Sequence, residues 1–310
     1  MGNMIRTEAL TKSYGEGRGI HDLTLDVPAN SIFGYIGPNG SGKSTTIKCL
    51  CGLLAPNSGR AWIGDKEVLP GNIHDIKRVI GYLPDDFGVY DQITVWEYLD
   101  FFGAAYKIPH AERRKRIDEV LELTHAAKFA DYLVNSLSRG MHQKIGIAKT
   151  MLHDPDLLIL DEPANGLDPH ARIEMRETIL RLKSIGKTIM LSSHILPELG
   201  AICDRVAILE KGKLLKQGTV KEITQSLQEH IALVIMVTSD LEKAVKSVKA
   251  HKTVRKVVAS GNELRLEFVG KREEIADLNE HLVRNKVRVI SLAEAEVDLE
   301  NVFLAVTGKN

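Results

Sequence analysis

The first third of the chain alternates apolar and polar positions and then reaches a glycine-rich loop. Alternation over residues 5–11 and 23–27 predicts two half-buried strands, with glycines turning the chain between them. A short apolar run at 31–36 predicts a buried strand that leads straight into the loop. Residues 44–53 then have helical spacing and end before Pro56, so we expect the loop to join a strand to a helix.

The middle of the chain has mainly helical patterns after a short strand at 80–83. Thr94 is expected to cap the first helix, because Glu97 stands three residues later and completes a capping box. The three expected helices span residues 94–106, 111–123 and 138–151. A basic run at 113–116 spreads round the second helix and is interpreted as a solvated face. Together these segments predict a helical subdomain at about residues 86–152.

Strands return in the next segment and alternate with a helix. The four expected strands span residues 157–160, 188–191, 206–209 and 213–216. A helix at 169–184 stands between the first two, and strand, helix and strand in that order imply parallel pairing. The predicted core is therefore an α/β fold, and the N-terminal strands form an antiparallel β subdomain beside it.

A second pattern begins after a helix at 220–228. Its elements are a strand at 231–237, a helix at 241–250, strands at 253–259 and 264–268, a helix at 271–285 and a strand at 287–292. That βαββαβ order is typical of a ferredoxin-like α+β domain. A last helix is expected at 299–306. We therefore predict a large domain at 1–227 and a small accessory domain at 228–310.

Composition narrows the class of protein. The chain has 310 residues, 44% of them apolar, which suits one large domain and one small one. Lysine plus arginine balance aspartate plus glutamate, 41 against 41, so no global charge favours nucleic acid. The N-terminus lacks the apolar core of a signal peptide, and the apolar runs are too short to span a membrane. We expect a soluble chain whose three cysteines are buried in the hydrophobic interior.

The glycine-rich loop matches the phosphate-binding pattern GxxxxGK[ST]. It comprises Gly37, Pro38, Asn39, Gly40, Ser41, Gly42, Lys43 and Ser44, followed by Thr45. Its glycines let backbone N–H groups converge on one anion, and the positive end of the next helix points at the same phosphates. Lys43 is expected to reach the β- and γ-phosphates of ATP, and the Ser44 hydroxyl to bind magnesium.

The apolar strand at 157–160 ends in two carboxylates, Asp161 and Glu162. Because ligands bind at the carboxyl ends of parallel strands, Asp161 is expected beside the magnesium and Glu162 one residue further on. There Glu162 can orient or deprotonate the attacking water. Alone, the pair could be two solvated acids at a strand end. Together with the phosphate loop, it predicts hydrolysis of ATP.

Four further features make the chain resemble the ATPase of ABC transporters over about residues 4–220. They are the sequence LSRGM at 137–141, similar to the signature LSGGQ, the sequence NGLD at 165–168, similar to the D-loop, His194, similar to the switch histidine, and Tyr14, placed like the ring that stacks on adenine. The resemblance implies an ABC cassette with a P-loop NTPase core, ATP and Mg²⁺ as cofactors, and a second ATPase subunit arranged head to tail in a homodimer or a heterodimer. In that arrangement Ser138 and Gly140 face the phosphate of the partner subunit's nucleotide, and His194 senses the γ-phosphate.

Three positions depart from the family pattern. Asp85 stands where the family has a glutamine that contacts magnesium and the transmembrane partner. Arg139 and Met141 replace the first glycine and the glutamine of the signature. A carboxylate can still ligate magnesium, so we assign Asp85 to the metal site with Ser44 and Asp161.

The C-terminal pattern, with the sequence LENVF at 299–303, resembles the appended domain of ABC-2-type exporter ATPases. The resemblance implies a cytoplasmic subunit on the inner face of the cell membrane that hydrolyses ATP to drive a transmembrane permease, with no nucleic-acid partner. Two alternatives stay open at this point. One is a soluble ABC ATPase that acts on ribosomes or DNA, and the other is a nucleotide-gated interaction module.

Overall fold

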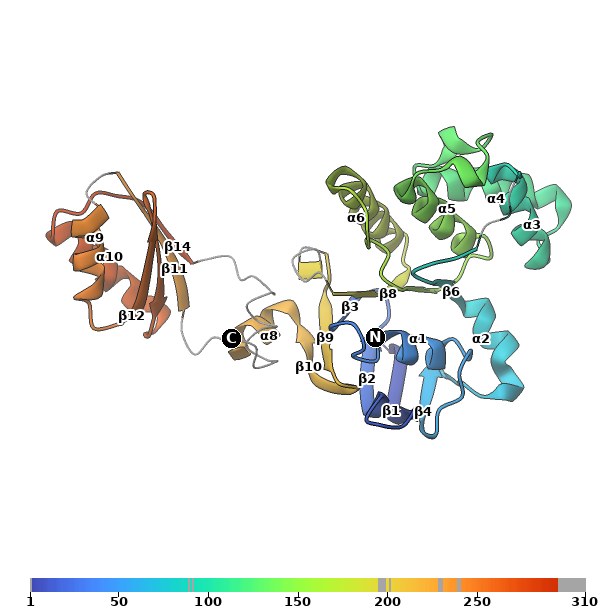
Figure 1. The fold of residues 1–310 in the computed structure, drawn as a ribbon, viewed down its shortest axis with the longest axis horizontal. Coiled ribbons are helices and arrows are strands. Elements are labelled where there is room, and N and C mark those ends of the chain that lie inside the picture. The colour runs from blue at the N-terminus through green and yellow to red at the C-terminus, as the bar shows by residue number, and fades with distance from the viewer. Residues whose placement is uncertain are drawn as a thin grey trace. The chain divides into compact units, whose positions relative to one another are not determined.

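The computed structural model describes residues 2–88, 90, 92–194, 199–200, 202–227, 231–238 and 241–294. Its contacts divide the chain into two compact units, residues 1–220 and 221–310, and each unit has its own hydrophobic core (Figure 1). The helix α8 (Val220–Leu227) begins at the division. The last expected helix, at 299–306, lies outside the described residues.

An antiparallel sheet forms one part of the first unit. Its strands are β1 (Asn3–Ser13), β2 (Gly19–Pro28), β4 (Ser58–Ile63) and β5 (Lys66–Glu67), in the order β2-β1-β4-β5. Buried residues recur at alternate positions through most of β2, so the half-buried strand expected there is confirmed. The patterns of the sequence did not predict β4, β5 or the short helix α2 (Ile73–Val79). The first half of β4 is exposed, and its antiparallel pairing with β1 stabilises it.

A six-stranded sheet carries the candidate site. Its strands are β3 (Ile32–Ile36), β6 (Ile80–Leu83), β7 (Leu157–Leu160), β8 (Thr188–Ser193), β9 (Arg205–Glu210) and β10 (Lys213–Thr219), in the order β10-β9-β3-β8-β7-β6. Every residue of β3, β7 and β8 is buried, as central parallel strands require. The pairing is parallel from β9 to β6, which confirms the expected α/β core, and β10 is antiparallel at one edge.

Helices cover both faces of this parallel sheet. In Figure 1, α6 (Pro169–Ser184) lies on one side, and α1 (Lys43–Leu50) lies on the other side together with the antiparallel sheet. Ile47 and Leu50 of α1 belong to a core cluster that draws residues from both sheets. The three cysteines are buried and free, as expected.

Three helices form the expected helical subdomain. They are α3 (Val95–Ala105), α4 (His110–Leu123) and α5 (Arg139–Met151). The predicted capping box of α3 is confirmed: the Glu97 N–H donates to Thr94 Oγ1 (3.2 Å), and the Thr94 N–H donates to Glu97 Oε2 (2.7 Å). Ser138 caps α5 by accepting a hydrogen bond from the Met141 N–H (3.4 Å).

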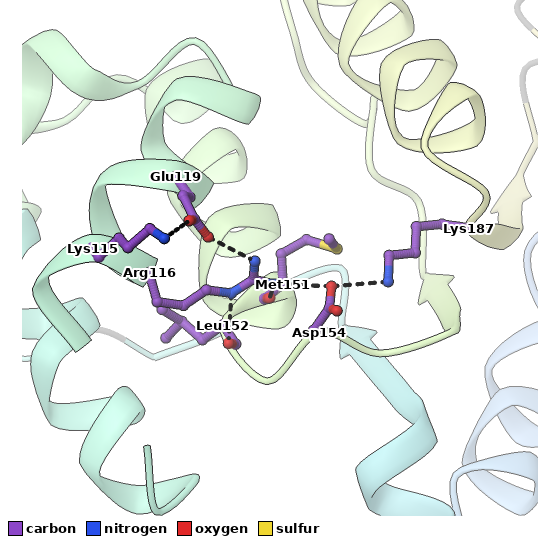
Figure 2. Close-up of polar contacts among 7 residues, drawn as sticks. All are labelled: Lys115, Arg116, Glu119, Met151, Leu152, Asp154 and Lys187. Carbon is purple, nitrogen blue, oxygen red and sulfur yellow. Dashed lines mark hydrogen bonds and ion pairs between the residues drawn. The ribbon is translucent and has the colours of Figure 1, made fainter. Parts of the chain in front are cut away.

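A charged cluster joins the helical subdomain to the parallel sheet (Figure 2). Arg116 on α4 donates to the carbonyl oxygens of Met151 (2.6 Å) and Leu152 (3.0 Å), where α5 ends. Asp154 accepts from both Arg116 (3.1 Å) and Lys187 (2.9 Å), and Lys187 directly precedes β8. The interpretation of the basic run as a solvated face is therefore wrong for Arg116, whose guanidinium supplies donors to the carbonyl groups that end α5. It is also wrong for Arg113, whose side chain is 13% exposed and lies 3.2 Å from Asp100.

The second unit is a four-stranded antiparallel sheet with two helices on one face (Figure 1). Its strands are β11 (Ile231–Val237), β12 (Val254–Ser260), β13 (Glu263–Phe268) and β14 (Val289–Glu294), and its helices are α9 (Leu241–Lys249) and α10 (Ile275–Arg284). The strand order is β12-β13-β11-β14, which together with the βαββαβ chain order is ferredoxin-like. Val248 of α9 and Leu278 of α10 pack in one cluster with the inward residues of the strands.

Candidate functional site

The phosphate loop joins β3 to α1, and two of its glycines stand where a side chain does not fit. A Cβ on Gly37 would lie 2.4 Å from Ser41 Oγ and 2.7 Å from the carbonyl oxygen of Leu209. Gly42 has φ +106°, in the left-handed region, and a Cβ there would lie 2.7 Å from a methyl group of Ile20. Both glycines therefore permit the concave backbone that a bound phosphate requires.

Lys43, the first residue of α1, is the buried cation of the loop. Only 6% of the residue is exposed. Its Nζ donates to the carbonyl oxygens of Gly37 (2.6 Å) and Pro38 (3.4 Å) and lies 3.2 Å from Glu162 Oε1. An ammonium group held between loop carbonyls and a carboxylate is well placed to exchange these partners for phosphate oxygens.

Glu162 is the centre of a chain of polar contacts at the ends of β7 and β8. Its Oε2 lies 2.8 Å from His194 Nδ1, and its N–H donates to Ser192 Oγ (2.9 Å). The Ser192 hydroxyl in turn donates to Asp161 Oδ1 (2.6 Å). Glu162 has φ +52°, a left-handed conformation that costs a residue with a side chain about 1–2 kcal/mol. The Ser192 hydroxyl therefore fixes both consecutive carboxylate residues, one through its backbone and one through its side chain.

A cleft of about 420 Å³ lies over the phosphate loop. It is lined by the loop residues from Pro38 to Thr45, by the three carboxylates of Asp85, Asp161 and Glu162, and by Tyr14, Arg18 and Gly19. Tyr14 is 51% exposed, which leaves its ring free to contact a flat base. His194 is absent from the described lining, and it reaches the cleft through Glu162 instead.

Ser138 and Gly140 lie apart from this cleft, at the N-terminus of α5. Neither is among the described residues that line it. Gly140 faces α6, since a Cβ on it would lie 2.9 Å from Ala171 Cβ. The structure thus does not bring these two residues to the phosphate loop of their own chain.

Asp85 follows β6 and has partners in the D-loop and in helix α5. Its Oδ1 accepts a hydrogen bond from Asn165 Nδ2 (3.2 Å) and lies 3.8 Å from Arg139 Nη2. Its backbone carbonyl oxygen accepts from Gln143 Nε2 (3.4 Å). The carboxylate is about half exposed, so it stays accessible from the cleft.

The residues of the cleft suit a magnesium nucleotide. The Ser41 hydroxyl is buried and has no hydrogen-bond partner among the residues that the structure describes, as expected of a group that binds a ligand. Ser44 and Asp161 contribute a hydroxyl and a carboxylate, which are the oxygen donors that Mg²⁺ prefers. Within the described ranges, no three His, Cys, Asp or Glu side chains cluster closely enough to hold a metal alone. That donor set fits an ion that takes further oxygens from bound phosphates.

Sequence reasoning did not assign roles to Ser192 and Asn165. Ser192 orders both carboxylates, and Asn165 holds Asp85. Ser192 carried a usable signal, because it stands near the carboxyl end of a strand that neighbours β7. A polar residue there is expected at the same edge of the sheet as Asp161.

Comparison with protein families and curated proteins gives matches along the whole chain. The ABC transporter family model matches residues 20–165. The linearmycin resistance ATP-binding protein LnrL of Bacillus subtilis is 30% identical, over 99% of this chain and 99% of that protein. The bacitracin transport ATP-binding protein BcrA of Bacillus licheniformis is 35% identical, over 99% and 98%. The Nod factor export ATP-binding protein I of Ralstonia nicotianae is 32% identical, over 99% and 94%.

Solved structures of ABC transporter subunits match most of the chain. CbiO1 from Clostridium perfringens, part of the ABC transporter complex CbiONQ, aligns with a TM-score of 0.67 at 27% identity, covering 73% of this chain and 92% of that one. An ATP-binding subunit of an ABC transporter aligns with a TM-score of 0.64 at 31% identity, covering 72% and 92%. None of the helices among the described residues is both long and apolar enough to cross a membrane. The chain belongs to the ABC transporter ATP-binding family, and it is an ATP-binding, ATP-hydrolysing subunit of a transporter.

Proposed function

We propose that this chain powers an exporter, by closing on ATP as a head-to-tail dimer and reopening after hydrolysis. The observation that carries the export assignment is the match over the full length, C-terminal unit included, to proteins named for linearmycin resistance, bacitracin transport and Nod factor export. Those names describe the relatives. The shared unit of residues 221–310 supports the same class of task here, as a docking or regulatory domain.

The proposed chemistry assigns one role to each residue of the cleft. Lys43 binds the β- and γ-phosphates after leaving Glu162, and the loop N–H groups bind the same phosphates. Glu162 then orients a water and takes its proton. His194, in contact with Glu162 Oε2, is free to exchange that contact for a γ-phosphate oxygen. Magnesium, held by Ser44 and Asp161 and by Asp85, would neutralise charge on the phosphates.

The second half of the site comes from a partner subunit in this proposal. Ser138 and Gly140 lie at a helix N-terminus, which attracts anions, yet they do not line the cleft of their own chain. This separation supports a dimer in which each signature helix faces the other subunit's nucleotide. Two cassettes then bury two ATP molecules between them.

We further propose a transmembrane permease as partner and a place on the cytoplasmic face of the membrane. Asp85 lines the cleft, and its backbone carbonyl oxygen accepts a hydrogen bond from Gln143 of α5, so motion at the phosphates can pass through the helical subdomain to a bound permease. The energy for transport comes from the different affinities of the open and closed states for ATP.

Dimer formation provides the test of this proposal. The full-length Glu162→Gln variant, which should hydrolyse slowly, is measured by light scattering with and without ATP. We expect a monomer without ATP and a dimer with ATP. Ser138→Ala added to Glu162→Gln should weaken the dimer while the affinity of the monomer for ATP stays unchanged. A chain that binds ATP fully and stays monomeric would contradict the head-to-tail model.

The partner class is tested separately. Co-expression with a permease encoded beside this gene, followed by purification in detergent, should give a stable complex. Co-sedimentation with ribosomes or with DNA, and no complex with the permease, would instead favour a soluble ABC ATPase.

A further inference from the structure

The two departures from the family motifs that bear charge lie next to each other in the structure. Asp85 replaces a neutral glutamine, and Arg139 replaces a glycine. They are far apart in the chain, yet Arg139 Nη2 lies 3.8 Å from Asp85 Oδ1. One change adds a negative charge and the other adds a positive charge, so the pair is neutral as a whole.

Both side chains are held in position by the D-loop. Asn165 Nδ2 donates to the same oxygen of Asp85 that faces Arg139. The guanidinium of Arg139 lies over Gly166, where a Cβ would come within 2.9 Å of Arg139 Cζ. Gly166 has φ +69°, so glycine there serves both the turn and the close approach of the guanidinium. The contacts with Asn165 and Gly166 thus fix the position of the ion pair, although each partner is about half exposed.

The charge of Asp85 matters because Asp85 lines the phosphate cleft. Asp161 and Glu162 line it too, which gives three carboxylates around the place of a polyphosphate anion. Two cations, Lys43 and Arg18, line the cleft as well. Lys43 has Glu162 at 3.2 Å and Arg18 has Glu16 at 3.9 Å, so neither is paired with Asp85. Without a counter-charge, and before magnesium binds, the carboxylate of Asp85 would repel the nucleotide.

We infer that Arg139 is a positioning residue that offsets the charge of Asp85 within one chain, and so permits a carboxylate beside the phosphates of ATP. This inference rests on the proposed nucleotide site. Arg139, at its position in the signature, has two possible modes of action. If Arg139 acts through Asp85, its removal matters only while residue 85 is charged. If Arg139 acts directly on the nucleotide of the partner subunit, its removal matters whatever stands at 85.

A double-mutant cycle on the full-length chain tests the inference. The variants are Arg139→Met, Asp85→Asn and the two combined. The measurement is the Kd of a fluorescent ATP analogue in magnesium-free buffer at low salt, so that metal ligation by Asp85 plays no part. Arg114→Met, an exposed arginine on α4, is the matched control. Arg139→Lys should rescue most of the loss, because it keeps the charge.

We expect Arg139→Met to weaken binding about two- to fivefold, the effect of losing a half-exposed charge pair. In the Asp85→Asn background the same substitution should change the Kd less than about 1.5-fold. The effect should shrink as ionic strength rises. In steady-state hydrolysis with magnesium, Arg139→Met should raise the KM for ATP more than it lowers kcat.

An equal loss of affinity in both backgrounds would overturn the inference, and so would no loss in either. Thermal unfolding curves that match the wild type verify that each variant is folded, and the neutral Arg139→Gln replaces Arg139→Met if Arg139→Met is not folded. A failure of the proposed function is distinguishable, because the wild type would then bind the analogue no better than Lys43→Ala does.

Discussion

Arg116→Met is the substitution that tests how α4 is held against the end of α5 in the helical subdomain. The arginine donates two hydrogen bonds to carbonyl groups at the end of α5, at 2.6 and 3.0 Å, and its side chain is only 23% exposed. Methionine keeps the apolar stem but offers the carbonyls no donor. Hydrogen bonds from a charged donor contribute about 1.5–3 kcal/mol each when buried, so partial exposure puts the total loss at about 2–3 kcal/mol. The contact with Asp154, which is mostly exposed, adds little.

Urea unfolding followed by tryptophan fluorescence measures this loss. Trp62 and Trp96 are the two tryptophans of the chain, and both belong to the first unit, so the signal reports on that unit. Arg114→Met is the control, since Arg114 is an exposed neighbour on the same helix, and its change should stay within about 0.5 kcal/mol. Equal unfolding free energies for the two variants would refute the view that the hydrogen bonds of Arg116 stabilise the packing of α4 against the end of α5.

Asp154, Gly37 and the buried cysteines provide three further tests. Burial alone would raise the pKa of Asp154, but the hydrogen bond and charge of Lys187, together with Arg116, outweigh it and lower the pKa below its ordinary value of 3.8. The stabilisation by Asp154 is therefore present above about pH 4 and lost as the pH falls through the lower folded-state pKa. Asp154→Asn should lower the free energy of unfolding by under about 1 kcal/mol at pH 7 and by less at pH 3, as measured by urea unfolding. Asparagine tolerates the φ of +54° that Asp154 adopts, so the backbone is not strained. An equal loss at both pH values would contradict the pairing of Asp154 with Lys187 and Arg116. Gly37→Ala should abolish binding of the fluorescent ATP analogue while the chain stays folded by circular dichroism, because the added Cβ would lie 2.7 Å from a backbone carbonyl oxygen; wild-type affinity would refute this. Burial raises the pKa of Cys49 to about 11 and that of Cys51 to about 12, so a thiol reagent at pH 8 should label the native chain far more slowly than the urea-unfolded chain; equally fast labelling would contradict their burial.

Local signals in the sequence predicted the elements that depend on local chemistry. The capping box of Thr94 and Glu97 fixed the start of α3, and the apolar run before Asp161 fixed β7 to the residue. The strand β4 was missed because its first residues are polar or glycine and exposed. Its conformation depends on pairing with β1, which a local pattern does not contain.

In the candidate site, too, the contacts between neighbouring strand ends could be predicted from the sequence and the contacts between distant segments could not. The proximity of Lys43 and Glu162 could be predicted, because both follow central parallel strands whose carboxyl ends share one edge of the sheet. The contact between Asp85 and Arg139 could not be predicted, because it depends on how the end of β6, the D-loop and the start of α5 come together in the tertiary structure. The buried role of Arg116 was mistaken for a similar reason: its partners are backbone carbonyls of another helix.

Hydrolysis of ATP by Glu162→Gln is the most direct test of the central claim, that this carboxylate primes the water. Single-turnover release of phosphate is measured with saturating ATP and magnesium, beside equilibrium binding of ATP to the same sample. The account predicts that binding stays within a few-fold of the wild type while hydrolysis slows by about 10²–10⁴, the usual contribution of a general base. A Glu162→Gln variant that turns over at the wild-type rate would contradict it.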